Sequence, residues 1–276
     1  MPVGLAGAPY RRPEAAVDRA GYDEGAQFWG RGPGRAFRSG MIGATLKIMD
    51  LAKPYFDVGL ATNNLEPMLA FWQHEIGLPF DHKLKVMKGM DQYRHDVLGS
   101  VLKINHYQAP LPATPASGYR ELIIARPGVP HAQHLTDPDG NRVCLVPPGT
   151  DGIGQIGMRL AVRNLEPHRG FYRTALGLTE ESYVHGAAFR AGESLLLVEE
   201  TADAPSDSAF DGPGWRYLTF QVFKVDREHA HTLDHGGREG FPPRTLGTTV
   251  RISMVRDPDG NWIELSQRAS LTGSLD

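Results

Sequence analysis

The pentapeptide Asp137-Pro138-Asp139-Gly140-Asn141 returns as Asp257-Pro258-Asp259-Gly260-Asn261. A second marker, Asn-Leu-Glu-Pro, occupies residues 64–67 and again residues 164–167. Two markers that recur in the same order indicate that one domain was duplicated within this chain. The pentapeptide recurs at a wider spacing than the tetrapeptide, so we expect the first copy to be the shorter one.

The chain has 276 residues, which is long enough for two globular domains. We place the first domain at residues 52–149, the second at residues 152–268 and a tail at residues 269–276. Residues 1–45 form an N-terminal extension that is rich in Gly and Arg and poor in the large apolar residues that a core needs. We interpret this extension as disordered or as lying upstream of a true start at Met41.

The charged residues make up 22% of the chain, are scattered along it and leave a formal net charge of −3. This pattern does not suit a nucleic-acid backbone or an anionic membrane surface. No apolar run approaches the length of about 18 residues that a membrane helix needs, and the N-terminus lacks a signal pattern. We therefore expect a cytoplasmic protein that binds a small molecule.

Each copy begins with a strand and a helix. In the first copy, the strand covers residues 55–61, and Pro67 and Gly77 are helix start and stop signals. In the second copy, the strand covers residues 157–162, and the same signals are Pro167 and Gly177. Two β segments follow each helix, near residues 80–89 and 100–107 in the first copy and near residues 181–190 and 194–200 in the second.

The later parts of the two copies differ in length. In the second copy, Leu218, Phe220 and Val222 alternate with polar residues, which predicts a strand with one apolar face and one face toward a cavity or solvent. A helix at residues 225–235 and strands at residues 250–255 and 262–266 follow. In the first copy, the connection after the matching strand at residues 118–122 is too short for a helical crossover. We expect that this copy has lost the helix and keeps a bare loop at residues 126–131.

This order of elements, with a final Asp-Pro-Asp-Gly-Asn turn that leads into a strand containing Ile263-Glu264-Leu265, resembles the vicinal oxygen chelate superfamily. The group includes glyoxalase I, type I extradiol dioxygenases, epimerases, and fosfomycin- and bleomycin-resistance proteins. The resemblance implies an α+β fold in which tandem βαβββ modules form two glyoxalase-like domains with curled mixed sheets. Four modules look like the two-domain arrangement of the extradiol dioxygenases.

Members of this superfamily that hold a metal place His, Gln or Glu at four inward strand positions. By the resemblance, the first copy offers Asp57, Lys103, Glu121 and Cys144 there. The second copy offers Gly157, approximately Leu197, Tyr217 and Glu264. Only Glu264 keeps the family's residue type, so the usual ligand set for a divalent cation is eroded.

The first copy suggests a site without a metal, because Asp57 and Glu121 would face each other with Lys103 between them. Lys103 would then polarise a carbonyl group while one carboxylate moves a proton from the neighbouring carbon, which is isomerase or lyase chemistry. The competing interpretation is a structural ion-pair network.

The second copy offers a comparable pair, Tyr217 and Glu264, with Arg159 as a third polar group. These residues would bind an oxygen-rich ligand, although an Arg159–Glu264 salt bridge explains two of them equally well. Further candidates for substrate binding are Thr219, Gln221 and Tyr183.

One divalent metal ion (Fe, Mn, Zn, Ni or Mg) remains a possible cofactor. Its candidate ligands are Asp57, Glu121, His134 and Glu264, where His134 lies on the shortened connection of the first copy. The one cysteine, Cys144, excludes an internal disulfide bond. A buried free cysteine is usually an apolar filler, and the sequence names no partner that would form its thiolate.

We interpret the chain as a small-molecule enzyme that acts on an oxygenated organic substrate by lyase, isomerase or ring-cleavage chemistry. The alternative is a binding protein without catalysis, like the bleomycin-resistance members. Either protein would be a monomer or a homodimer.

Overall fold

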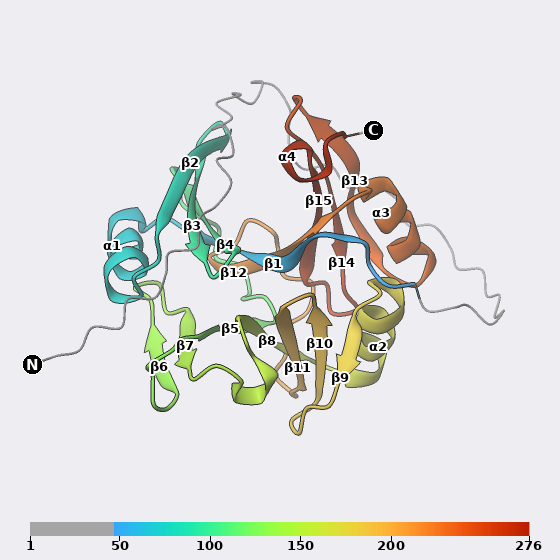
Figure 1. The fold of residues 1–276 in the computed structure, drawn as a ribbon. Coiled ribbons are helices and arrows are strands. Elements are labelled where there is room, and N and C mark those ends of the chain that lie inside the picture. The colour runs from blue at the N-terminus through green and yellow to red at the C-terminus, as the bar shows by residue number, and fades with distance from the viewer. Residues whose placement is uncertain (1–46, 276) are drawn as a thin grey trace, which may run out of the picture.

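The computed structural model describes residues 47–275, which form two curled mixed sheets (Figure 1). The expectations for residues 1–45 and for a start at Met41 lie outside the described residues. The 8-stranded sheet has the order β13 (Arg238–Leu246), β14 (Val250–Arg256), β15 (Trp262–Arg268), β12 (Gly214–Val222), β1 (Leu51–Thr62), β4 (Ser100–Tyr107), β3 (Met90–Val97), β2 (Phe80–Met87). The 7-stranded sheet has the order β6 (Gln133–Thr136), β7 (Arg142–Val146), β5 (Tyr119–Ala125), β8 (Ile156–Val162), β11 (Ser194–Glu200), β10 (Ala187–Ala191), β9 (Thr179–Glu181). The expected α+β class with curled mixed sheets is confirmed.

Each sheet takes strands from both copies of the repeat. Each copy consists of two units of neighbouring strands. The first unit of the first copy, β1–β4, joins the last unit of the second copy, β12–β15, through antiparallel pairing of β1 with β12. The two middle units, β5–β7 and β8–β11, join in the same way, through antiparallel pairing of β5 with β8. The duplication is therefore interleaved, and residues far apart in the sequence meet on one sheet.

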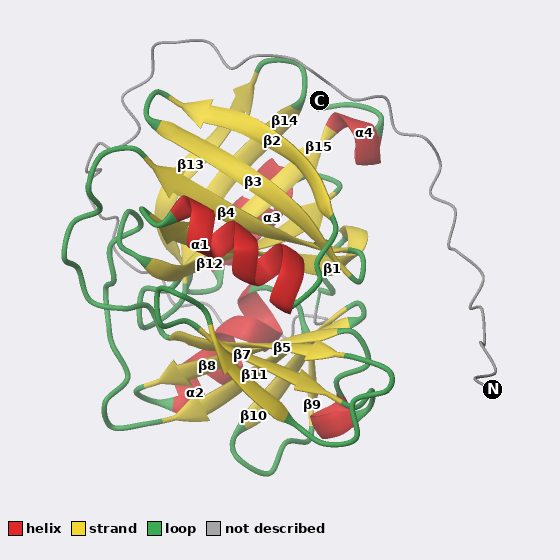
Figure 2. Ribbon diagram, turned by 90° about the vertical axis from the view of Figure 1, so that its left-hand side faces the viewer, coloured by secondary structure: helices red, strands yellow, loops and turns green. Residues whose placement is uncertain are grey.

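In Figure 2, α1 lies in front of strands of the 8-stranded sheet, and its buried side chain Met68 joins the main core. In the first and third units, a short α-helix continues into a π-helical turn that brings two aromatic side chains into the core. The helical segments are α1 (Leu65–Ala70) with its π turn (Phe71–Glu75), a 3-10 turn (Thr150–Gly152), α2 (Leu165–Gly170) with its π turn (Phe171–Ala175), α3 (Val225–Asp234) and α4 (Ala269–Thr272).

The main core lies between the two sheets. The strand faces that are not buried in this core are the ones available for a site. On β12, Leu218, Phe220 and Val222 are buried in this core, as the alternation predicted. Successive strand residues point to opposite faces. The polar residues between them therefore point to the concave side of the 8-stranded sheet, away from the 7-stranded sheet (Figure 1).

The repeated pentapeptide forms the same turn twice. The side chain of Asp137 accepts hydrogen bonds from the backbone N–H groups of Asp139 and Asn141, at 3.0 and 2.8 Å. Asp257 accepts from the backbone N–H of Asn261 at 2.8 Å. The glycine of each turn has a positive φ, 87° at Gly140 and 84° at Gly260, which an L side chain rarely adopts. The need for these hydrogen bonds and for a glycine with positive φ explains why the pentapeptide has the same sequence in both copies.

The first copy is shortened as expected, and by more than a helix. Residues 126–132, between β5 and β6, contain no helix or strand. The last unit of the first copy thus has neither a helix like α3 nor an outer strand like β13. As a result, β6 is an edge strand of only four residues.

Several strands were not distinguished in the sequence, and β3 and β13 are the longest of them. β3 lies between two β segments that the sequence predicted, and β13 follows α3 where no strand was expected. β13 contains Pro242 and Pro243 and pairs with β14 through two register shifts. Proline argues against a strand except at a sheet edge, and β13 is at that edge.

Candidate active site

The concave face of the 8-stranded sheet carries a row of polar side chains from both copies. Asp57 on β1 is in register with Thr219 on β12, and Thr219 is in register with Glu264 on β15. Lys103 on β4 is in register with Gly59, two residues beyond Asp57 on the same face. Two strands from each copy therefore build one polar centre, and they are brought together by the pairing of β1 with β12.

Lys103 is at the middle of this centre. Its Nζ donates to Thr219 Oγ1 at 2.6 Å and to Glu264 Oε1 at 3.2 Å, and it lies 5.4 Å from the centre of the Tyr217 ring. Burial lowers the pKa of Lys103, while the charges of Glu264 and Asp57 act against this shift. An ammonium group has three N–H donors, so one remains for a ligand beside these two contacts.

The Tyr217 ring is placed by a glycine on the neighbouring strand. A Cβ atom at Gly59 would lie 2.3 Å from the ring, so only glycine leaves room for it. The Tyr217 hydroxyl oxygen accepts from the side-chain amides of Asn105 at 3.2 Å and Gln92 at 3.5 Å. Burial, and then the charge of Glu264, raise the pKa of Tyr217 well above its ordinary value. Tyr217 is therefore a neutral hydroxyl donor at neutral pH.

Asp57 is charged, in contrast to Tyr217. Burial alone would raise its pKa, but the positive charges of Lys53, Lys103 and Arg94 together lower it to about 2. Its oxygens accept from Lys53 Nζ at 2.6 Å, from the backbone N–H of Val101 at 2.9 Å and from the Gln221 amide at 3.2 Å. Asp57 is thus a fixed negative charge and a weak base.

A cavity of about 80 Å³ opens onto this centre. Residues of both edge strands, β2 and β13, line it, so the sheet curls until its two edges approach the same space. Arg94 lines the cavity, is 6% exposed, and has an Nε that contacts no acceptor among residues 47–275. Besides Lys103, Tyr217 and Glu264, the lining includes Gln92, Asn105, Phe210, Phe241, Met254 and Arg268.

The grouping predicted for the first copy is wrong. Glu121 lies on β5 in the other sheet, whereas Asp57 and Lys103 lie in the 8-stranded sheet. Arg159 does not pair with Glu264 but donates from Nε to Glu121 Oε2 at 3.3 Å and also contacts Glu199. Both errors have one cause, namely that the units pair between copies and not within them.

The structure places the remaining candidate residues in both sheets. Thr219 and Gln221, expected to bind a substrate, hold Lys103 and Asp57 in place. Tyr183 lies near the other sheet, where its hydroxyl accepts from Arg159 at 2.7 Å and donates to Glu199 at 2.6 Å. Gln92, Arg94 and Asn105 were not among the predicted site residues. The sequence of β3 gave no clear signal for the first two, because polar residues occupy both faces of this strand.

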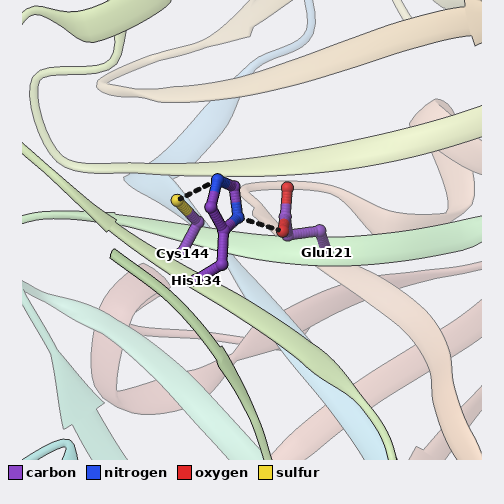
Figure 3. Close-up of side chains that lie close together, drawn as sticks. All are labelled: Glu121, His134 and Cys144. Carbon is purple, nitrogen blue, oxygen red and sulfur yellow. Dashed lines mark hydrogen bonds and ion pairs between the residues drawn. The ribbon is translucent and has the colours of Figure 1, made fainter. Parts of the chain in front are cut away.

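The concave face of the 7-stranded sheet carries a second cluster, Glu121, His134 and Cys144 (Figure 3). His134 Nδ1 lies 3.2 Å from Glu121 Oε1, and His134 Nε2 lies 4.0 Å from Cys144 Sγ. Arg142 Nη2 donates to Glu121 Oε1 at 3.3 Å. Burial and the charge of Glu121 raise the pKa of Cys144. The cluster joins Glu121 and His134, which were both candidates for metal ligands.

Neither centre, as arranged, suits the divalent cation that the fold family implies. In the 8-stranded sheet, the buried ammonium group of Lys103 lies against Glu264 and repels a second cation. In the 7-stranded sheet, one ligand atom from each residue lies within 4.8 Å of the others. However, the His134 ring turns one nitrogen toward Glu121 and the other toward Cys144, and a single ion binds only one of them.

Residues 152–265 match the model of the Glyoxalase/Bleomycin resistance protein/Dioxygenase superfamily. Glyoxalase I from Zea mays aligns with a TM-score of 0.62 and 15% identity over 79% of this chain and 95% of that chain. A putative dioxygenase from Bacillus subtilis subsp. subtilis str. 168 aligns with a TM-score of 0.61 and 10% identity over 81% and 86%. At these identities the two structures establish the fold alone.

No curated protein matches the sequence. Among the described residues, no helix has the length and apolar character needed to cross a membrane.

Proposed function

Residues 152–265 place this chain in the Glyoxalase/Bleomycin resistance protein/Dioxygenase superfamily, the vicinal oxygen chelate group, and from this premise we propose that it is a small-molecule enzyme. Its substrate is an oxygenated organic compound, and its active site is the concave face of the 8-stranded sheet. The reaction is a proton transfer next to a carbonyl group, as in an isomerase or a lyase.

One observation carries the proposal: Lys103 Nζ and Glu264 Oε1 lie 3.2 Å apart, and both side chains line the cavity. An ammonium group stabilises the negative charge that develops on a carbonyl oxygen when a neighbouring proton is removed. A carboxylate beside it accepts that proton. Glu264 is the residue we assign as the base, because the lowered pKa of Asp57 makes Asp57 a poor one.

The surrounding residues have separate tasks in this reaction. Tyr217 donates its hydroxyl hydrogen to a second substrate oxygen. The guanidinium group of Arg94, with its unpaired Nε among the described residues, attracts a substrate that carries a partial or full negative charge. Asp57 and Thr219 orient Gln221 and Lys103 and do not themselves react.

Proton transfer is favoured over ring cleavage because of the charge at this centre. Cleavage of an aromatic ring by dioxygen uses a metal ion that binds both reactants. The ammonium group of Lys103 supplies positive charge at the same place but offers no open coordination position. It therefore supports carbonyl polarisation only.

A binding protein without catalysis is the second candidate. The Phe210 and Tyr217 rings stack with centroids 5.4 Å apart, and both line the cavity. Such a platform holds a planar ligand without reacting with it. The cavity volume of about 80 Å³ is smaller than the roughly 300–1,000 Å³ of most small-molecule pockets, so the ligand is compact or the edge strands β2 and β13 separate to admit it.

Exchange of carbon-bound hydrogen for deuterium tests the proposal without knowledge of the product. The protein would be incubated in D₂O with a panel of α-hydroxy ketones, α-keto acids and α-hydroxy acids, and loss of the α-proton signal followed by NMR. We expect exchange with the wild type and with Glu166→Gln, whose side chain is 74% exposed on α2, but not with Glu264→Gln. Saturable binding of a panel member with no exchange and no conversion would support the binding protein instead.

A further inference from the structure

The shortened edge of the 7-stranded sheet exposes one member of the second cluster, His134, to solvent, whereas Glu121 is 1% and Cys144 3% exposed. His134 on the edge strand β6 is 63% exposed and is in register with Cys144 on β7. In the 8-stranded sheet the equivalent pair is Met254 and Glu264, and there β13 lies outside β14. Because the first copy has no counterpart of β13, a small molecule can approach His134 from the sheet edge.

The contacts of His134 fix the roles of its two nitrogens. Glu121 is 1% exposed, and its oxygens accept hydrogen bonds from Arg142 and Arg159, so they act as acceptors in this cluster. The nitrogen that faces it, Nδ1, must therefore carry the hydrogen. In the neutral ring, Nε2 is then the acceptor, and this is the nitrogen that faces Cys144 Sγ.

This order of groups is the order of a nucleophile, its base and the residue that orients the base. Figure 3 shows the His134 ring between the other two side chains. The distance from Nε2 to Sγ, 4.0 Å, lets the thiol point its hydrogen at the ring. Cys144 itself lies at the border between this charged cluster and an apolar cluster that includes Ile123 and Leu197.

We propose that Cys144 is a nucleophile that adds to a carbon electrophile of the α,β-unsaturated carbonyl class, with His134 as its general base. Glu121 is a positioning residue that keeps the imidazole in the required tautomer. This site is separate from the proposed proton-transfer site in the 8-stranded sheet and does not depend on it.

The addition is balanced without a further reactant. The S–H bond breaks and its proton moves to His134 Nε2, while Sγ forms a bond to the β-carbon. The electrons of the carbon–carbon double bond move toward the carbonyl group. The proton then returns from His134 to the α-carbon, which leaves a thioether on Cys144 and a neutral imidazole.

The environment of the thiol decides when its proton moves. Since burial and Glu121 raise the pKa of Cys144, the resting residue is a thiol and not a thiolate. The proton is therefore transferred as the carbon–sulfur bond forms, which makes the reaction depend on the base.

N-ethylmaleimide is a suitable probe, because it is an α,β-unsaturated carbonyl compound and Cys144 is the only cysteine in the chain. The rate constant for the mass increase of the native protein would be measured for the wild type, His134→Ala, Glu121→Gln and His131→Ala. We expect His134→Ala to be slower by about tenfold or more. Added imidazole should restore part of that rate, and His131→Ala, which alters an exposed neighbour of β6, should match the wild type.

The labelling rate constant of Glu121→Gln should lie between those of the wild type and His134→Ala, because the amide no longer fixes the tautomer of the His134 ring. Thermal unfolding of each variant shows whether it remains folded. An equal or faster rate in His134→Ala, no rescue by imidazole, or labelling only after denaturation would each overturn the proposal. So would tight binding of one Zn²⁺ that is lost in His134→Ala, because the cluster would then be a metal site.

Discussion

Lys103 and Glu264 are 161 residues apart in the chain, yet their side chains meet at 3.2 Å on the concave face of the 8-stranded sheet. Lys103 comes from the first unit of the first copy, and Glu264 comes from the last strand of the second. They meet because β1 and β12 join the two copies at the centre of this sheet. The centre therefore exists only when the two copies are interleaved.

Replacing Lys103 with Met should reduce both activity and stability. The substitution keeps the apolar stem but leaves Thr219 and Glu264 without their donor, and loss of a buried partner costs about 1–3 kcal/mol. Urea unfolding measures this loss. The double variant Lys103→Met/Glu264→Gln should regain part of it, since no unpaired carboxylate remains. If the double variant is destabilised by the full sum of the single changes, the two residues are not coupled.

Protonation of Asp57 in acid should lower the stability of the protein. Its pKa is lowered from 3.8 to about 2 in the folded protein. A group with a lowered pKa stabilises the folded state fully above the unfolded value, and this contribution is lost as pH falls from about 4 to about 2. The contribution is about 2 kcal/mol. Unfolding free energies measured across this range should show a weaker pH dependence for Asp57→Asn than for the wild type.

Introducing a methyl group at Gly59 should disturb the Tyr217 ring, because the new Cβ would lie 2.3 Å from it. Gly59→Ala is therefore expected to lose about 1–3 kcal/mol of stability through overpacking. Ligand affinity in the cavity should fall with it, which isothermal titration measures once a ligand is known. Gly154→Ala is the matched control, since no atom lies within 4 Å of its added Cβ. Equal stability of the two variants would show that Tyr217 moves aside without cost.

Glu264→Gln should affect turnover far more than folding. The substitution preserves the shape of the side chain but removes the base, and loss of a general base lowers turnover by about 10²–10⁴-fold. The melting temperature should change by only a few degrees, because the amide oxygen still accepts from Lys103. Steady-state kinetics on any substrate found by deuterium exchange would check this, and an unchanged kcat would remove Glu264 from the mechanism.

The fold could be predicted from the sequence because its markers are local. The turn at residues 257–261 and the alternation along β12 depend on neighbouring residues, which a sequence displays directly. The edge strand β13 was missed because its two prolines are tolerated only at a sheet edge, and edge position is a property of the whole sheet.

The site could be predicted only in part, because its assembly is not local. Lys103, Tyr217 and Glu264 were each singled out, but Lys103 was grouped with Glu121 on the assumption that units pair within one copy. The sequence does not show which unit joins which, since the strands that join the units are far apart in the chain. The role of Cys144 depended on the same information, because its neighbours His134 and Glu121 lie on two other strands.

The pairing of β1 with β12 and of β5 with β8 has a consequence for the history of this chain. A separate half, such as residues 152–275, would present two unpaired strand edges, one on β8 and one on β12. Unpaired edges form hydrogen bonds with the strands of other chains. Two identical halves would satisfy each other by exchanging units, as in a domain-swapped pair. The present chain has the topology of such a pair fused into one polypeptide. Once fused, one half was able to lose an outer strand while the other kept it, which an assembly of two identical subunits does not permit.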